Sequence, residues 1–428
     1  MSNKKLCHID CPDWASLHGA LVYLLLDKLL EPIDHVRFAA VCKEWGAVSE
    51  DYNEAKHRWC KKRLLPMLLI SSAESEEKLE LYSIAERKVY SNIELALPYR
   101  KSMRCFGSNH DSGGWLIVVD IVEAESPYLD ITLVNPFRKE VPPIHLPRLV
   151  PGSPFNYLSE QGLKVILSGD PTLNPDSFVV LAIIPYTDNV SYIKGLNSVW
   201  VFWGYGFGST DAIVNKSKIY SVSRGHGFGR RILFLDVDQA KTNMFYLPEP
   251  LFRSPGKLYL VESAQGDLLL VQRVMEPKKN VNGLHHNKEL WTSSFVIHKA
   301  TFIKRDEKVD GPCSPLRLRG CSLILGDGDR SAAVQLNQVE SIGDEVLFVG
   351  NNYSFSVLAS DYPGTCQPNS IYYTDDSMEI ELDGDAPYDM GIFNLADKSI
   401  TPLCSSLNHS KRIIQPPFWT IPPFSGLW

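Results

Sequence analysis

Two glycine runs have the spacing that most strongly suggests catalytic or cofactor chemistry. Gly204-x-Gly206-x-Gly208 and Gly225-x-Gly227-x-Gly229 could in principle cradle the phosphates of a nucleotide. A dinucleotide-binding loop, however, joins a strand to a helix whose N-terminus faces the pyrophosphate, and strand-like sequence follows both runs. No Gly-Lys-Ser/Thr completes a phosphate-binding loop. We therefore interpret both runs as hairpin loops.

The groups that could bind a metal are incomplete. Cys7, His8 and Cys11 lack the fourth ligand of a structural zinc site. The adjacent His285 and His286 would point to opposite faces of a strand. Two aspartate–glycine–aspartate segments lack the oxygen ligands that complete a calcium loop; they are residues 327–329 and 383–385.

The chain also has no His-Glu-x-x-His and no Gly-x-Ser-x-Gly motif. We expect no catalytic residue, no metal, no cofactor and a non-enzymatic role. A triad assembled from distant residues stays open at this point, because the sequence does not show such geometry. An enzymatic site at the centre of the fold is therefore a third, weaker hypothesis.

Composition and charge exclude several classes of protein. Of the 428 residues, 44% are hydrophobic and 22% are charged, and the net charge is −7. A large folded core is expected at this length. A mildly acidic chain is a poor candidate for binding nucleic acid or an anionic membrane. We expect neither partner.

The cysteines and the first residues indicate the compartment. Nine cysteines are scattered without framework spacing, which favours a reducing environment. The N-terminal sequence has no apolar signal segment. The apolar run Leu21–Leu30 is too short to span a bilayer and contains Asp27 and Lys28. We expect an intracellular protein, cytoplasmic or nuclear.

The elements that would position any site begin with two short helical patterns in residues 13–48, separated at Glu31-Pro32. Apolar residues recur there at helical spacing, namely Leu17, Leu21, Leu24, Leu25 and Leu29, then Val36, Val41 and Trp45. A segment this short cannot bury so much apolar surface within itself. Some of that surface is expected to face a partner protein.

Short strand patterns replace the helices from Met67 onward, separated by Gly, Pro, Asn and Asp. A strand–turn–strand theme recurs, for example from Lys218–Tyr220 to Ile232–Val237, from Glu345–Val349 to Ser354–Val357, and from Ser370–Tyr372 to Met390–Leu395. Four-stranded propeller blades of about 40–50 residues give this rhythm. We predict a mainly β fold: a disordered tail over 1–12, a small α-helical domain over 13–66, and a β-propeller of roughly six to eight blades over 67–428. A pair of β-sandwiches is the alternative.

The helical region resembles an F-box. The residues that match are Leu17, Leu21, Leu25, Leu29, Val36, Arg37, Phe38, Val41, Cys42, Lys43 and Trp45, and the ending Val41-Cys42-Lys43-x-Trp45 is the most specific. At the start of its first helix, where that family usually has Leu-Pro and an acidic residue, this chain has Leu17-His18-Gly19. A helical hairpin packed on the rest of the chain is the structural alternative.

Further resemblance covers nearly the whole chain. It is to plant proteins in which an F-box precedes a kelch-like propeller of the KIB type. It rests on Gly113–Leu116, Ile131–Phe137, Lys164–Pro171 with Asn174-Pro175, Leu347–Gly350, Phe355–Val357, Asp361–Gly364, Asn369–Asp376, Met390–Phe393 and Pro416–Trp419. Physically, Asn135-Pro136 and Asp170-Pro171 start turns, and Phe418 and Trp419 are expected to help bury the closing strand. We interpret these motifs as scaffold.

Together these resemblances imply a substrate-receptor subunit of an SCF-type cullin–RING ubiquitin ligase. In that family the helices bind a Skp-type adaptor and the second domain binds a target protein, which here is unknown. The implied adaptor contacts are Trp14, Leu17, Leu21, Leu25, Val36, Val41, Cys42 and Trp45, with Trp45 as the main hot spot. The alternative, suggested by His18 and Gly19, is a binding or scaffold propeller with a degenerate F-box.

Overall fold

The computed structural model describes the helical region and most strands of the following domain. The described residues are 13–29, 32–56, 65–71, 79–90, 103–107, 112–122, 127–138, 140–150, 162–184, 189–205, 208–215, 217–223, 230–247, 256–277, 290–304, 332–362, 364–375, 389–403 and 417–422. The predicted tail 1–12, both histidines at 285–286 and the segments 327–329 and 383–385 lie outside them. The second glycine run, Gly225 to Gly229, also lies outside them, although the strands on either side of it are described.

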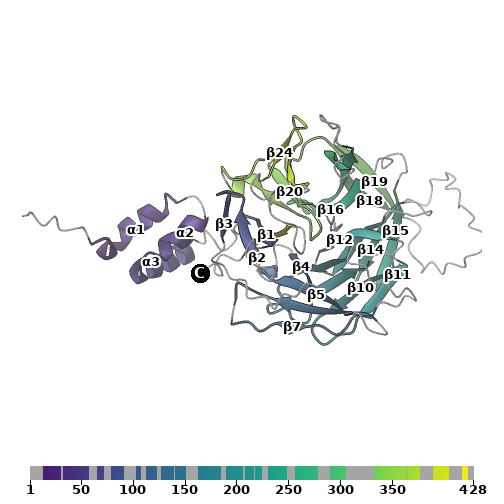
Figure 1. Cartoon of the computed structure of the whole chain (residues 1–428), viewed down its shortest axis with the longest axis horizontal. Coiled ribbons are helices and arrows are strands. Elements are labelled where there is room, and N and C mark those ends of the chain that lie inside the picture. Colours follow the sequence, from purple (N-terminus) through teal and green to yellow (C-terminus); the bar gives the residue numbers. More distant parts are fainter. Residues whose placement is uncertain are drawn as a thin grey trace, which may run out of the picture.

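The helical region has a short 3-10 turn and three helices. They are η1 (Trp14–Ser16), α1 (Gly19–Leu26), α2 (Pro32–Ala39) and α3 (Lys43–Lys56). These helices lie to one side of a ring of sheets, next to strand β3 (Figure 1). Val22, Leu26 and Tyr52 form the buried centre of the helical region, and this apolar cluster is separate from those of the sheets. The helices therefore have a small core of their own.

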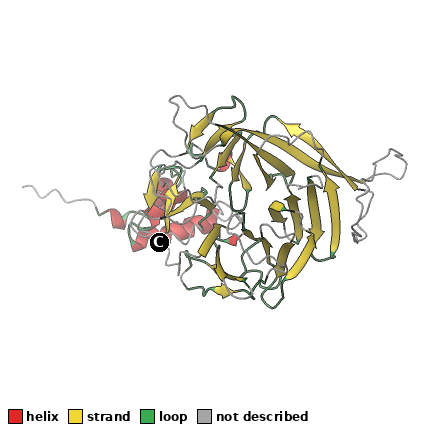
Figure 2. Cartoon of the chain, turned by 45° about the vertical axis from the view of Figure 1, so that its right-hand side comes forward, coloured by secondary structure: helices red, strands yellow, loops and turns green. Residues whose placement is uncertain are grey.

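The described strands form six sheets arranged around a central axis (Figure 2). We call each sheet a blade and number the blades 1 to 6 around the ring. Blade 2 holds β4 (Met103–Gly107), β5 (Leu116–Val122), β6 (Tyr128–Val134) and β7 (Ile144–His145). Blade 3 holds β8 (Lys164–Leu167), β9 (Val179–Ile183), β10 (Asn189–Lys194) and β11 (Val201–Tyr205), and blade 4 holds β12 (Ser209–Asn215), β13 (Lys218–Ser223), β14 (Arg231–Asp236) and β15 (Lys241–Tyr246). Within these three blades each strand pairs antiparallel with the next.

The remaining blades are built by the rest of the chain. Blade 5 holds β16 (Gly256–Glu262), β17 (Leu268–Glu276), β18 (Trp291–Lys304) and β19 (Ala332–Val339). Blade 6 has the order β21 (Phe355–Leu358), β20 (Glu345–Val349), β22 (Ser370–Tyr373), β23 (Gly391–Asn394), β24 (Ile400–Pro402). Blade 1 has the order β25 (Phe418–Thr420), β1 (Met67–Ser71), β2 (Leu79–Ser83), β3 (Lys88–Tyr90). The fold is a six-bladed β-propeller, within the predicted range, and the β-sandwich alternative is wrong.

The ring is closed by the last described strand. β25 pairs antiparallel with β1, so blade 1 combines strands from both ends of the domain. Trp419 on β25 is fully buried, and its indole Nε1 donates to the carbonyl of Val349 in blade 6 at 3.1 Å. Its ring also meets Phe348 edge-on at 5.0 Å. The predicted burial of the closing strand is confirmed.

Two sequence interpretations need correction. The sequence pattern indicates separate repeats that begin at Glu345–Val349 and at Ser370–Tyr372, but both segments lie in one sheet. There β20 pairs parallel with β22, because β21 folds back to the inner position of the same blade. The first glycine run is not a hairpin loop, because the flanking strands β11 and β12 belong to different sheets. It connects blade 3 to blade 4.

Polar side chains from distant motifs tie blade 2 to blade 3. Trp115 donates from Nε1 to Asp170 at 3.0 Å, and Arg138 forms an ion pair with the same carboxylate. Asn135 accepts from the backbone of Phe137 at 3.1 Å and donates to the carbonyl of Gly113 at 3.0 Å. The predicted turn residues thus serve as scaffold and also join two sheets.

Candidate docking surface on the helices

Side chains cap the short helices of residues 13–56. Asp13 accepts from the backbone of Ala15 at 3.2 Å before η1, and His18 accepts from the backbone of Ala20 at 3.3 Å before α1. The sulfur of Cys42 accepts from the backbone of Trp45 at 3.4 Å before α3. These contacts satisfy amide donors that have no partner within a helix. His18 and Gly19 therefore begin the first helix and do not prevent it.

The inner face of α1 is packed against α3. Val22 and Leu26, four residues apart, are buried with Tyr52 of α3. The hydroxyl of Tyr52 donates to Asp27 at 2.6 Å, and its ring stacks on His35 of α2 with centroids 5.8 Å apart. One aromatic residue thus joins all three helices.

The opposite face of α1 is open. Leu21, Leu24 and Leu25 have the i, i+3, i+4 spacing of one helix face. These leucines, with Trp14 and Val41, are 41% to 62% exposed. An exposed apolar patch on a helix of a small helical unit is a common mark of a protein-docking surface. We call the five residues Trp14, Leu21, Leu24, Leu25 and Val41 the leucine face.

Three other predicted contact residues are partly buried. Trp45 stacks on Phe38 with ring centroids 4.3 Å apart, and its Nε1 donates to the carbonyl of Trp14 at 3.0 Å. Leu17 packs against the helical core, and Cys42 is half-buried at the start of α3. The side chain of Val36 lies outside the described residues. Trp45 therefore supports Trp14 from within the unit, and its role as a hot spot stays a prediction.

Leu24 is the member of this surface that the sequence-based set of contacts omits. It is more exposed than Leu21 or Leu25. Its spacing of three residues from Leu21 already places it on their helix face. The signal was therefore present in the sequence.

A polar contact joins the helices to blade 1. Arg37 of α2 forms an ion pair with Glu86 at 2.7 Å and donates to the hydroxyl of Tyr90 on β3 at 2.7 Å. Burial, together with the hydrogen bond to Glu86, raises the pKa of Tyr90 to about 12. The phenol therefore stays protonated at neutral pH and donates to the Glu86 carboxylate.

The described residues hold neither a metal-binding group nor a membrane-spanning helix. They hold no group of three or more histidine, cysteine, aspartate or glutamate side chains placed to bind a metal ion. Among the helices described, none has the length and apolar character needed to cross a membrane. What the geometry offers is an exposed apolar surface on the helices.

Comparison with known proteins identifies the domain. The sequence model of the KIB1-4 beta-propeller family matches residues 81–394, more than half of the chain. The chain belongs to the KIB1-4 beta-propeller family. The match runs from β2 to the end of β23, so the six-bladed ring is the KIB1-4 domain, and strands outside the match close it.

Curated relatives extend the likeness beyond the KIB1-4 domain. Three Arabidopsis thaliana proteins are each 22% identical to this chain: F-box protein At2g17690 (95% of this chain, 99% of the relative), F-box protein At2g17036 (96% and 94%) and F-box protein SKIP23 (95% and 95%). An alignment that covers 95% of the chain leaves fewer residues unmatched than the helices contain, so it includes helical residues. The chain is thus similar over nearly its full length to plant F-box proteins.

Proposed function

We propose that this protein is the substrate receptor of a cullin–RING ubiquitin ligase, and that its leucine face binds a Skp-type adaptor. The observation that carries the proposal is the apolar surface of α1, which the described part of the chain leaves open. Similarity to proteins named F-box proteins supports it. The expected compartment is intracellular, cytoplasmic or nuclear.

In this role the protein performs no chemistry itself. The helices hold the adaptor and the KIB1-4 propeller holds a target protein. Tethering both in one complex raises the effective concentration of a target lysine near the charged conjugating enzyme. Binding and positioning are therefore the whole contribution of this chain to the reaction.

A charged double substitution in the leucine face tests adaptor binding. Leu21→Asp with Leu24→Asp places two carboxylates in the proposed apolar interface, and the cost of desolvating them should weaken adaptor affinity by roughly a hundred-fold. The measurement is titration of purified adaptor against the full-length chain. Trp45→Ala is a poorer choice, because loss of the stack on Phe38 would disturb the helices themselves.

Leu173→Asp is the control for placing a carboxylate at an exposed leucine elsewhere on the chain. Leu173 is 74% exposed, more than any leucine of the leucine face, and lies between β8 and β9 of the propeller. The Leu173→Asp variant should bind the adaptor like the unmodified chain. Circular dichroism should show unchanged helix content in all variants. If the double variant also binds like the control, the docking assignment fails, and a scaffold propeller with a degenerate F-box becomes the better description.

A further inference from the structure

The outermost strand of blade 3 is an open sheet edge. Among the described strands, β11 pairs only with β10, so one row of its backbone N–H and C=O groups faces outward. Val199, Val201 and Phe202, on and just before this strand, are 42% to 74% exposed. Consecutive residues of a strand point to opposite faces. Apolar side chains are therefore exposed on both faces of this edge.

Other outer strands of the propeller carry features that block strand addition. β3 and β15 begin with lysine, β7 has two residues and β24 ends with Pro402. β15 is also partly covered, because Phe302 of the long strand β18 packs on Phe245 with centroids 4.7 Å apart. Over Val201–Trp203, β11 has no lysine, no proline and a regular register with β10, and its one register shift lies beyond Trp203, opposite Asn189 and Val190.

The charge around this edge restricts what could bind it. Residues 195–209, GLNSVWVFWGYGFGS, contain no charged side chain, although 22% of the chain is charged. Within this segment a charged partner would lose hydration and meet no opposite charge. Open backbone groups and uncharged β-branched and aromatic side chains match an extended, uncharged polypeptide segment.

We propose that β11 recruits an extended, uncharged segment of the target protein as an additional strand of blade 3. Main-chain hydrogen bonds would supply affinity, and contacts with Val201 and Phe202 would select side chains on the two faces of the added strand. That the segment belongs to a ubiquitination target rests on the proposed function. β11 lies across the ring from the helices (Figure 1), so adaptor and target would not compete for space.

The test selects peptides without assuming their sequence. A library of random linear peptides of about twelve residues is selected on the full-length chain and, in parallel, on Val201→Lys with Phe202→Lys, which gives β11 the charged edge seen elsewhere. Enriched peptides should be uncharged and rich in β-branched or aromatic residues. The best peptide should bind the double variant roughly ten-fold more weakly.

Two controls separate strand addition from general stickiness. Ile400→Lys, on the outer strand of blade 6, should leave peptide affinity within about two-fold. N-methylation of alternate peptide amides, tried in both registers, should abolish binding in one register, because it removes the main-chain donors that face β11. Unchanged thermal unfolding confirms that the lysine variants fold.

The proposal is overturned by any of three results. These are no enrichment, enrichment of charged peptides, or peptides that bind the β11 variant as well as the unmodified chain. Sedimentation showing a dimer that the β11 variant lacks would also overturn it, since a second copy would then occupy the edge. Adaptor affinity of the same variant is measured alongside: if it is intact while peptide selection fails, only the β11 proposal is lost.

Discussion

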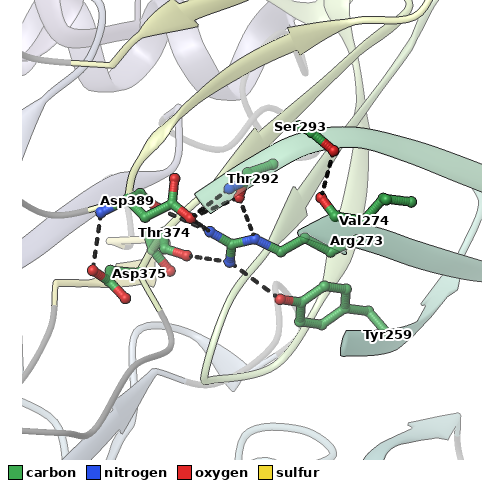
Figure 3. A network of polar contacts seen from close by, with 8 residues as sticks. All are labelled: Tyr259, Arg273, Val274, Thr292, Ser293, Thr374, Asp375 and Asp389. Atoms are coloured by element: carbon green, nitrogen blue, oxygen red, sulfur yellow. Dashed lines mark hydrogen bonds and ion pairs between the residues drawn. The ribbon is translucent and has the colours of Figure 1, made fainter. Parts of the chain in front are cut away.

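The guanidinium of Arg273 on β17 lies 3.0 Å from the carboxylate of Asp389, 116 residues later in the chain. Both side chains are buried, and Figure 3 shows the polar contacts around them. Arg273 also donates to the backbone carbonyl of Thr374 at 2.9 Å and to Thr292 at 2.6 Å. Asp389 in turn accepts from the backbone and hydroxyl of Thr292. A buried, hydrogen-bonded ion pair therefore joins blade 5 to blade 6.

Removing Arg273 should destabilise the propeller strongly. Arg273→Ala leaves the Asp389 carboxylate buried without its cation, a change that costs about 3–5 kcal/mol in comparable sites. The measurement is the free energy of unfolding in urea. Lys398→Ala breaks an exposed pair with Glu340 and should change stability by less than about 0.5 kcal/mol. Equal effects of the two substitutions would contradict a structural role for the buried pair.

Ring closure should depend on Trp419 through two separable contributions. Trp419→Ala creates a cavity between blades 1 and 6 and should cost about 3–5 kcal/mol. Trp419→Phe keeps most of the packing against Phe348 but loses the donor to Val349, which leaves a smaller loss of about 1–3 kcal/mol. Thermal and urea unfolding measure both. If phenylalanine is as damaging as alanine, the ring packing assigned to this residue is wrong.

The strand rhythm of residues 67–428 predicted the propeller, but its blade boundaries were only partly readable. Where strands pair in chain order, as from β12 to β15, turn residues and alternating apolar residues mark each strand. Blade 6 departs from that order, because β20 pairs with β22 in parallel. Local sequence carries no sign of such a pairing, since it depends on contacts between distant residues.

In the helical region too, features set by local spacing could be predicted from the sequence, and contacts between distant residues could not. The spacing of Leu21 and Leu25 predicted an open helix face, and the structure exposes both. Helical spacing alone did not show that Trp45 would be engaged by Phe38 within the unit. Nor could it reveal the contact of Arg37 with Glu86, because those residues lie 49 positions apart.

Acid should weaken the link between blades 2 and 3 through Asp170. Burial alone would raise the pKa of this carboxyl, but hydrogen bonds from Thr172 and Arg138 outweigh it and hold the pKa below its usual value. A lowered pKa in the folded state contributes stability above the unfolded-state pKa of about 3.9. That contribution is lost as the pH falls through the folded-state pKa.

Asp170→Asn tests this pH dependence. The variant should be less stable than the unmodified chain at neutral pH, and the difference in unfolding free energy should narrow as the pH falls below about 4. Urea unfolding between about pH 3 and pH 7 measures it. Asp176→Asn, an exposed aspartate of the same loop, controls for the loss of one negative charge. If the difference in unfolding free energy between Asp170→Asn and the unmodified chain stays constant with pH, the role assigned to the ionised carboxylate is wrong.

The orientation of the helices relative to the propeller should depend on Arg37. Its ion pair with Glu86 is partly exposed, so salt screens it and Arg37→Ala should barely change global stability. Loss of the contacts with Glu86 and Tyr90 should instead broaden the distance distribution between a dye on α3 and one on blade 1, read by single-molecule energy transfer. Tyr90→Phe should give an intermediate result, and raising NaCl from about 0.05 M to about 0.5 M should reproduce the Arg37→Ala effect in the unmodified chain. Asp34→Ala, which removes only the pair within α2, is the control. Distributions that do not respond to Arg37→Ala or to salt would show that other contacts set the orientation.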